Sequence, residues 1–143
     1  MKNLYEELGI TKAIKNTIRD VDEHTDIFIS SNIDDISNTL TKDQELNLYR
    51  IVQETLSNIV KHANAEAAKI SVIKESKRIL IVIKDNGDGF DFSERYNDFK
   101  SLGLKTLRER TKYLKGTMKV DSEKNKGTTF SYIIPIAWWI HPL

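Results

Sequence analysis

The chain turns at Asp85-Asn86-Gly87-Asp88-Gly89-Phe90, directly after the apolar run Arg78-Ile79-Leu80-Ile81-Val82-Ile83-Lys84. Such a run is typical of a buried strand, so the turn predicts a carboxylate, Asp85, at the rim of a sheet. Gly87 and Gly89 leave the neighbouring backbone bare enough for a flat ligand to lie against it. An ionised carboxylate only accepts hydrogen bonds, so the partner expected for Asp85 is a donor such as an exocyclic amine.

Two other interpretations of this hexapeptide are a plain β-turn and a calcium-binding loop. Asn-Gly and Asp-Gly are strong hairpin signals, so the β-turn stays open for the motif taken alone. The calcium loop is excluded, because Gly87 occupies the third ligand position and Tyr96 the twelfth, where a glutamate is required.

Composition restricts the class of protein. The 143 residues suit one domain. With 22 basic and 21 acidic residues the net charge is +1, which argues against general nucleic-acid binding. The absence of cysteine excludes disulfides and zinc–thiolate sites. No apolar run approaches the roughly 20 residues that span a bilayer. We therefore expect a cytoplasmic location, either of a whole protein or of the cytoplasmic part of a membrane-anchored one.

Hydrophobic periodicity and turn residues divide the chain into helices and strands. Helices are expected over residues 3–22 (interrupted at Gly9), 41–63 and 104–114. Strands are expected over residues 26–30, 69–74, 78–84, 117–121 and 128–134. Polar loops are expected over residues 31–40 and 91–102. A capping box of Thr41 and Gln44 begins the second helix, and Gly116 is the expected C-terminal cap of the third. The order predicts an α+β fold, a two-layer α/β sandwich with about three helices on one face of a mixed, mostly antiparallel sheet.

The helix expected over residues 41–63 has two contrasting faces at about 100° per residue. The apolar arc contains Leu48, Val52, Leu56, Ile59 and Ala63. The polar arc contains Asn47, Glu54, Asn58 and Lys61, with His62 at its margin. One interpretation of the polar arc is a solvated surface with no further role.

The other interpretation of the polar arc is a site for a metal-bound polyphosphate. Glu54, Asn58 and Lys61 are surface neighbours at their spacing. A neutral asparagine oxygen suits Mg²⁺, and an ammonium group neutralises phosphate charge. Glu54 is then placed to orient or deprotonate a nucleophile. His62 either contacts phosphate or packs against the sheet.

Four segments together resemble the catalytic ATP-binding domain of bacterial sensor histidine kinases, in the branch of the nitrate-sensing and membrane-fluidity-sensing kinases. Residues 48–63 resemble the N box, 85–90 the first glycine box, 102–110 the second, and 127–130, followed by Pro135, the last. The resemblance implies the Bergerat ATP-binding fold, which type II topoisomerases, a heat-shock chaperone, mismatch-repair ATPases and anti-sigma-factor kinases share.

The resemblance implies how adenine is held. Asp85 accepts a hydrogen bond from the adenine amino group, and Gly87 and Gly89 let the base lie close to the backbone. The Thr128 hydroxyl supports this contact, with Thr129 as the less favoured substitute.

The resemblance also implies how the triphosphate is held. Asn58 binds Mg²⁺, and Lys61, with His62, meets phosphate. Gly103 begins a helix whose N–H groups near Leu104 and Lys105 face the phosphates, as helix N-termini favour anions. The loop 91–102 corresponds to a lid over the nucleotide. The candidates to cover the base are Phe92, Tyr96 and Phe99.

The sequence departs from the family pattern at two places. Ser101 stands where the second glycine box usually begins with a further glycine. The phosphoacceptor histidine, which is followed by an acid in family members, is missing, because His24, His62 and His141 do not fit that pattern.

We therefore expect residues 1–25 to form an N-terminal connector helix and residues 26–136 the ATP-binding domain, with a tail of open role at 137–143. The expected function is to bind ATP with Mg²⁺ and to transfer the γ-phosphoryl group to a histidine on a separate dimerisation domain of the same protein, with a response regulator downstream. The alternatives are a related-fold ATPase, an anti-sigma-factor serine kinase, or a nucleotide-binding module without activity.

Overall fold

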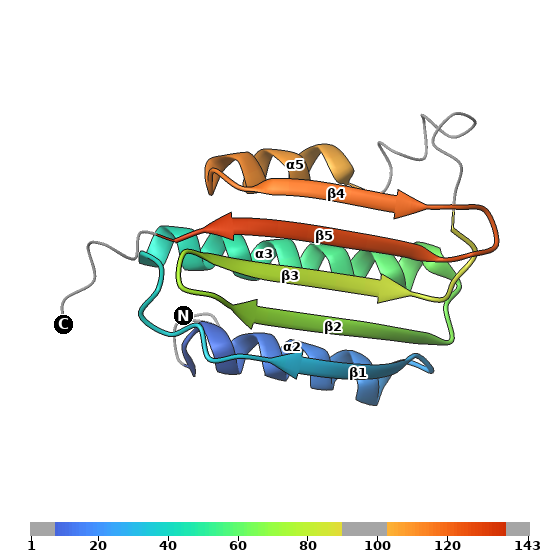
Figure 1. The fold of residues 1–143 in the computed structure, drawn as a ribbon. Coiled ribbons are helices and arrows are strands. Elements are labelled where there is room, and N and C mark those ends of the chain that lie inside the picture. The colour runs from blue at the N-terminus through green and yellow to red at the C-terminus, as the bar shows by residue number, and fades with distance from the viewer. Residues whose placement is uncertain (1–7, 90–102, 137–143) are drawn as a thin grey trace.

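The computed structural model describes residues 8–89 and 103–136 of the chain. Within these ranges the chain folds into two layers, with a sheet on one side and helices on the other (Figure 1). The predictions made for Phe92, Tyr96, Phe99 and Ser101, and for the tail at 137–143, lie outside the described residues.

The sheet has five strands in the order β1-β2-β3-β5-β4. The strands are β1 (Phe28–Ile33), β2 (Ala67–Lys74), β3 (Arg78–Asp85), β4 (Thr117–Ser122) and β5 (Thr128–Pro135). β1 runs parallel to β2, and the other neighbouring pairs are antiparallel. The predicted mixed, mostly antiparallel sheet is confirmed, with β3 at its centre.

The helices cover one face of this sheet (Figure 1). They are α2 (Ile10–His24), α3 (Lys42–Asn58), the π-helix η1 (Ile59–Ala63) and α5 (Leu104–Tyr113). α3 is central and packs against both α2 and α5. We call the other side of the sheet the open face.

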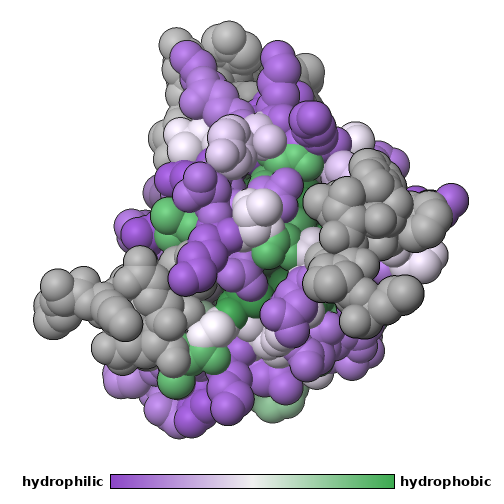
Figure 2. All heavy atoms as spheres, turned by 90° about the vertical axis from the view of Figure 1, so that its left-hand side faces the viewer, coloured by the Kyte–Doolittle hydropathy of each residue, from purple (hydrophilic) through white to green (hydrophobic). Residues whose placement is uncertain are grey.

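Strand alternation explains why one face of the sheet carries the core. Ile79, Ile81 and Ile83 of β3 are all fully buried against the helices, whereas Leu80 and Val82 face the other way and are half-buried. Asp85 continues the buried series at the end of the strand. The carboxylate predicted at the rim is therefore on the helix side of the sheet. At the opposite end of the molecule, Figure 2 shows a largely hydrophilic surface with a few apolar groups between the polar ones.

One boundary near the N-terminus is confirmed and one differs from expectation. Leu8 is helical, Gly9 is not, and α2 begins at Ile10 with Gly9 (φ +79°) as its N-cap, so the interruption predicted at this glycine is confirmed. β1 extends to Ile33, into the segment 31–40 expected to be a loop. Pairing with β2, in which Ile33 lies opposite Val72, overrides the low strand propensity of the serine and asparagine residues.

The long helix begins as predicted and ends in a turn of a different helix type. The Thr41 Oγ1 accepts the Gln44 N–H, and the Gln44 side chain accepts the Thr41 N–H, so the capping box is confirmed. Helical structure continues to Ala63 as predicted, but the last turn, η1, is a π-helix and not an α-helix. A π-turn is wider than an α-turn, so a projection at about 100° per residue misplaces the side chains beyond Asn58.

The end of α5 shows why Gly116 is a glycine. The Gly116 N–H donates to the Thr111 carbonyl at 2.9 Å and the Lys115 N–H to the Lys112 carbonyl at 2.9 Å, which is a Schellman cap. The left-handed residue is Lys115, with φ +57°, not Gly116 as a glycine cap suggests. Gly116 is required by packing, since a Cβ there would lie 2.6 Å from the carbonyl oxygen of Ile133.

Candidate functional site

Asp85 is buried at the end of β3, with 2% of its surface exposed. Its Oδ1 accepts the Gly87 N–H at 2.8 Å. Burial raises the pKa of Asp85 above the ordinary value of 3.8, while hydrogen bonds from the backbone of Gly87 and Thr128 act in the opposite direction. The site therefore holds a carboxyl group with a strong demand for a donor when it is ionised.

The Asp85 rim is joined to the end of the long helix through the backbone. The Asp88 N–H donates to the Ala63 carbonyl at 2.8 Å, so η1 and the turn after β3 are directly bonded. A Cβ on Gly87 would lie 2.1 Å from that same carbonyl oxygen. Gly87 is thus required by the protein's own backbone, apart from any approach of a ligand. The π-helical turn brings the Ala63 carbonyl to this position.

The β4–β5 turn closes the other side of the rim. A Cβ on Gly127 would lie 2.2 Å from the Asp85 carbonyl oxygen, and one on Gly89 would lie 2.0 Å from the Glu123 carbonyl oxygen. Both glycines have φ values in the left-handed region, +79° and +63°. The first and last glycine boxes therefore interlock through backbone contacts that only glycine permits.

Thr128 lies directly opposite Asp85 in the register of β3 and β5. It is buried on the helix side, and its Oγ1 lies 2.8 Å from the Ser122 Oγ. Thr129 alternates to the open face. The structure thus places Thr128, and not its substitute Thr129, on the same side of the sheet as Asp85.

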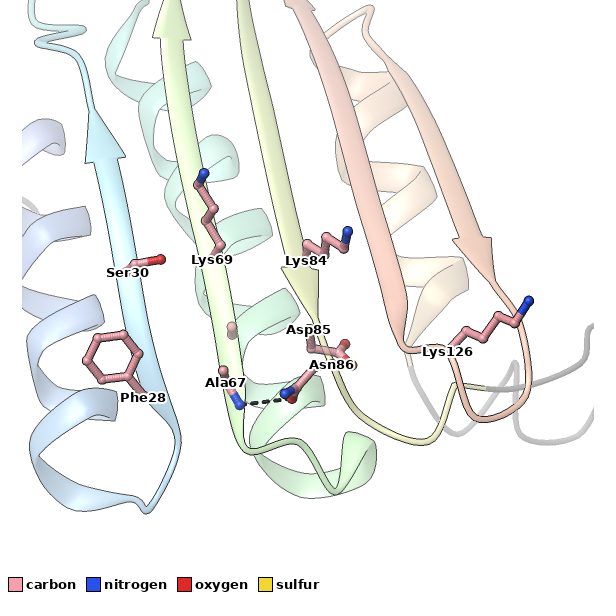
Figure 3. A pocket seen from close by; sticks show the side chains of 9 residues that line it. Phe28, Ser30, Ala67, Lys69, Lys84, Asp85, Asn86 and Lys126 are labelled. Atoms are coloured by element: carbon pink, nitrogen blue, oxygen red, sulfur yellow. Dashed lines mark hydrogen bonds between the residues drawn. The ribbon is translucent and has the colours of Figure 1, made fainter.

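Asn86 anchors the rim, a role that the sequence reasoning did not assign. Its Oδ1 accepts the N–H groups of Glu66 and Ala67, each at 2.9 Å, and Figure 3 shows the second of these bonds. The side chain thereby ties the turn after β3 to the start of β2. The partners lie 20 and 19 positions earlier in the chain, so no local pattern at Asn86 indicates these bonds.

On α3, Glu54 and Asn58 are half-buried, one turn apart, as predicted. Lys61 and His62 lie in η1 and are exposed. Because η1 is π-helical, the expected α-helical spacing from Asn58 to Lys61 does not apply. The link from Ala63 to Asp88 nevertheless keeps this turn beside the Asp85 rim.

Glu54 forms an ion pair with α5. Its Oε1 lies 3.1 Å from both the Nε and the Nη2 of Arg110, and the Arg110 Nη1 donates to the Asn47 Oδ1 at 3.3 Å. Arg110 belongs to the segment that resembles the second glycine box, yet the sequence reasoning gave it no role. Periodicity within one helix contains no signal for a pair between helices.

The N-terminus of α5 has the form expected for an anion site. Gly103 is its N-cap, with φ +68°, and as a glycine it has no side chain to cap the first turn. Leu104 is buried and Lys105 is exposed. The first N–H groups of a helix lack partners within the helix, so they favour a negative ligand.

A hollow of about 320 Å³ lies on the open face, behind the Asp85 rim. Phe28, Lys69, Lys84 and Lys126 line it, and the lysine side chains project from the strands and the β4–β5 turn (Figure 3). Lys84 and Asp85 are neighbours on a strand and point to opposite faces. Asp85 and Asn86 also line the hollow, so it adjoins the Asp85 rim from the open face.

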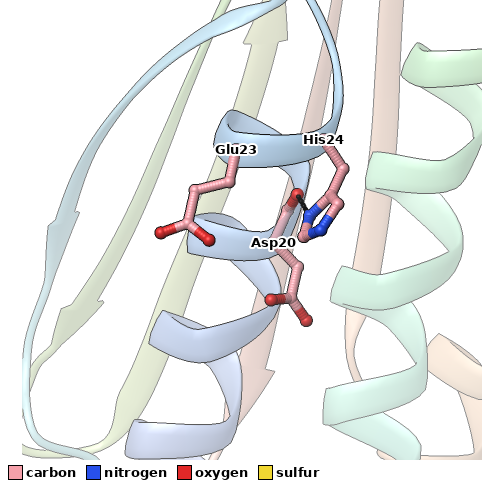
Figure 4. A group of neighbouring side chains, drawn as sticks. All are labelled: Asp20, Glu23 and His24. Atoms are coloured by element: carbon pink, nitrogen blue, oxygen red, sulfur yellow. Dashed lines mark hydrogen bonds between the residues drawn. The ribbon is translucent and has the colours of Figure 1, made fainter.

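The end of α2 carries a small group of polar side chains. Asp20, Glu23 and His24 are exposed neighbours (Figure 4), and the His24 Nδ1 lies 2.9 Å from the Asp20 carbonyl oxygen. This spacing is that of successive turns of one helix, so local geometry explains the group.

A family comparison agrees with this arrangement. Residues 43–137, more than half of the chain, match the family described as histidine kinase-, DNA gyrase B-, and HSP90-like ATPase. The chain belongs to this ATPase family. The resemblance predicted from the four boxes is confirmed at the level of the family.

Curated relatives of this ATPase domain are sensor kinases by name. The signal transduction histidine-protein kinase/phosphatase DegS of Brevibacillus brevis is 34% identical over 131 residues, which cover 92% of this chain and 33% of DegS. The sensor histidine kinase ComP of Bacillus subtilis is 34% identical over 121 residues, which cover 85% of this chain and 16% of ComP. The chain thus spans a third or less of the length of these relatives.

Solved structures share the fold of this ATPase domain. The histidine kinase domain of the blue-light activated histidine kinase of Erythrobacter litoralis EL346 has a TM-score of 0.76 at 15% identity. The match covers 90% of this chain and 61% of that domain's chain. The ATP-binding domain of PrrB from Mycobacterium tuberculosis has a TM-score of 0.67 at 23% identity. That match covers 89% of this chain and 93% of the PrrB chain. The predicted fold class is confirmed.

Among the helices of the described residues, none has the length and apolar character needed to cross a membrane.

Proposed function

We propose that the chain is the ATP-binding catalytic domain of a sensor histidine kinase. It binds ATP with Mg²⁺ and transfers the γ-phosphoryl group to a histidine on a separate dimerisation domain of the same protein. The observation that carries the proposal is a buried carboxyl group, Asp85, locked between the N box and the last glycine box. The sensor-kinase names of the relatives support the kinase over an ATPase or a binding module.

Asp85 recognises the base in this proposal. Its ionised carboxylate accepts the adenine amino group, whereas guanine presents a carbonyl oxygen at the corresponding position, and two acceptors repel each other. Thr128, buried opposite Asp85, adds a hydroxyl group to the contact. Gly87 and Gly89 keep the adjoining backbone free of side chains on the base.

Asn58 is the proposed Mg²⁺ ligand. Its amide oxygen is a neutral hard donor, half-buried at the last residue of α3. This donor suits a cation that takes few protein ligands and completes its shell with phosphate oxygens and water. When bound, the cation neutralises charge that develops on the phosphates.

The triphosphate lies between η1 and α5 in this proposal. Lys61 and His62 approach it from η1, and the N–H groups near Leu104 and Lys105 from the N-terminus of α5. Phosphoryl transfer needs mostly positioning and charge neutralisation, so these groups supply the main part of catalysis.

Glu54 orients the attacking imidazole. A neutral imidazole has a nucleophilic lone pair without prior loss of a proton, so a carboxylate on its other nitrogen need only hold the ring in line. The phosphoacceptor domain, and a response regulator that takes the phosphoryl group afterwards, are the proposed protein partners, and the cytoplasm is the proposed location.

The test combines the chain with a separately prepared dimerisation domain that bears the histidine. We expect acid-labile phosphate on that domain, dependent on ATP and Mg²⁺, and weaker binding of GTP than of ATP in calorimetry. Steady ATP hydrolysis without the partner, and no transfer to it, would instead identify a related-fold ATPase. Binding of ATP with neither reaction would identify a binding module.

A further inference from the structure

Arg110 holds one oxygen of Glu54, and among the described residues the other oxygen has no hydrogen-bond partner. Both the Nε and the Nη2 of Arg110 lie 3.1 Å from the Glu54 Oε1. Within residues 8–89 and 103–136, no hydrogen bond reaches Oε2. An oxygen that already accepts two N–H groups has little capacity left for a proton, whereas Oε2 keeps its full capacity as an acceptor.

The ion pair joins two elements that the proposed function uses at once. Glu54 lies one turn before Asn58 on α3, and Arg110 lies on the helix that begins at Gly103. Asn47, a further two turns back on α3, accepts the remaining arm of the guanidinium at 3.3 Å. A planar guanidinium with two partners on one helix has a fixed orientation, so it also fixes the Glu54 carboxylate.

The stability of the fold gives little reason for this arrangement. The Arg110 and Glu54 side chains remain 30% and 33% exposed, and exposed ion pairs contribute about 0–1 kcal/mol. The ion pair therefore matters mainly for the orientation of Glu54, because it holds the carboxylate in one rotamer beside the proposed Mg²⁺ ligand.

We propose that Arg110 is a positioning residue, which holds the Glu54 Oε1 so that Oε2 accepts the N–H of the incoming imidazole. The inference rests on the proposed function and deepens it. The lone pair of the other imidazole nitrogen forms the bond to the γ-phosphorus as the bond to the bridging oxygen breaks, and that electron pair leaves with ADP. The proton stays on the first nitrogen, where the Glu54 carboxylate stabilises the positive charge of the phosphorylated ring.

The experiment measures transfer to a supplied histidine-bearing domain, together with ATP affinity and thermal unfolding. In Arg110→Gln we expect kcat to fall roughly tenfold to a hundredfold, the scale of a misplaced group. ATP affinity and the apparent KM for ATP stay within about twofold of the parent, because Arg110 contacts Glu54 and Asn47, neither of which is proposed to bind the nucleotide. Lys112→Gln, which removes an exposed charge from the same helix, is the matched control and leaves all three quantities unchanged.

Two further variants separate positioning from folding. Arg110→Lys retains the charge without the fork geometry, so it recovers only part of kcat. Asn47→Ala removes the third contact and leaves the ion pair, so it gives a smaller loss in a folded protein even where Arg110→Gln unfolds. The double variant Glu54→Gln with Arg110→Gln has a kcat no lower than that of the less active single variant, since both changes interrupt one interaction.

The proposal is overturned if kcat in folded Arg110→Gln equals that of the parent, or if only ATP affinity falls. Multiplicative losses in the double variant also overturn it, because they would mean that Arg110 acts independently of Glu54. Absence of transfer in the parent itself is a different result, and it counts against the proposed kinase function.

Discussion

Replacing Asp85 by asparagine removes a buried charge without changing the shape of the side chain. At neutral pH we expect Asp85→Asn to bind ATP more weakly and to unfold at the same temperature as the parent or slightly above it. The second expectation follows from the raised pKa of Asp85, since the folded protein disfavours the ionised carboxyl relative to the unfolded chain. The substitution is thus expected to weaken ATP binding without lowering the stability of the fold.

The structure sets the size of the loss in affinity. In the parent, Oδ1 is occupied by the Gly87 N–H at 2.8 Å. The amide oxygen of the variant keeps this bond, which turns its NH₂ group to the side of Oδ2. A donor then faces the adenine amino group, itself a donor. Loss of a hydrogen bond to a charged group costs about 1.5–3 kcal/mol, or roughly a 10- to 150-fold weaker Kd.

Calorimetric titration with ATP, together with thermal unfolding of both proteins, measures the two effects. Asp88→Asn makes the same chemical change at an exposed residue of the same turn, so it controls for general charge effects and leaves affinity and melting temperature unchanged. An unchanged Kd in Asp85→Asn refutes the assignment of Asp85 as the adenine acceptor. A large fall in melting temperature would refute the inference that the buried charge is a cost to the fold.

The pH dependence gives an independent check on the same group. As pH rises above 3.8, the unfolded chain loses the Asp85 proton before the folded protein does, so the unfolded state binds fewer protons. The parent therefore loses stability relative to Asp85→Asn across the window from 3.8 up to the raised value. ATP affinity of the parent rises over that window, because ionisation turns the carboxyl into an acceptor. Identical pH profiles in the two proteins contradict this account.

The remaining predictions concern the metal and the fold. Asn58→Ala is expected to remove most of the Mg²⁺ dependence of ATP binding, and titrations with and without Mg²⁺ that still differ as in the parent exclude it as the ligand. Gly87→Ala is expected to lower the melting temperature strongly, since its Cβ would lie 2.1 Å from the Ala63 carbonyl oxygen; Gly9→Ala, where nothing lies within 4 Å, costs only the left-handed conformation. Equal melting temperatures for the two glycine variants contradict this packing. Thr41→Ala is expected to cost about 1 kcal/mol of unfolding free energy through the lost capping box, and a change in ATP affinity instead would place the cap in the site.

Much of the fold was predictable because its signals are local. The apolar run of β3 predicts a buried strand, and the capping box of Thr41 and Gln44 predicts the start of α3. The boundaries that differ depend on distant partners. β1 continues to Ile33 because β2 lies beside it. Gly116 is required by the nearby Ile133 carbonyl, whereas the left-handed conformation is adopted by Lys115.

The candidate site likewise contains residues that local motifs indicate and contacts that only the fold creates. Asp85, Asn58 and Gly103 were proposed from short motifs whose residue types suit the chemistry of a nucleotide. The ion pair of Arg110 with Glu54 was not identified, since it joins residues 56 positions apart on two helices. The bond of Asn86 to the start of β2 crosses from one strand to the next and was missed as well.

By itself, the sequence determined the order of elements and the ATPase family, and it supplied the residues proposed to meet adenine, cation and phosphate, because side-chain chemistry and periodicity are properties of short segments. Only the tertiary structure decided that η1 is a π-helix, that Gly87 faces the Ala63 carbonyl, and that Arg110 holds Glu54. These contacts form when helices and strands pack together. The hydrophobic periodicity of one segment does not show which residues of another segment it will contact.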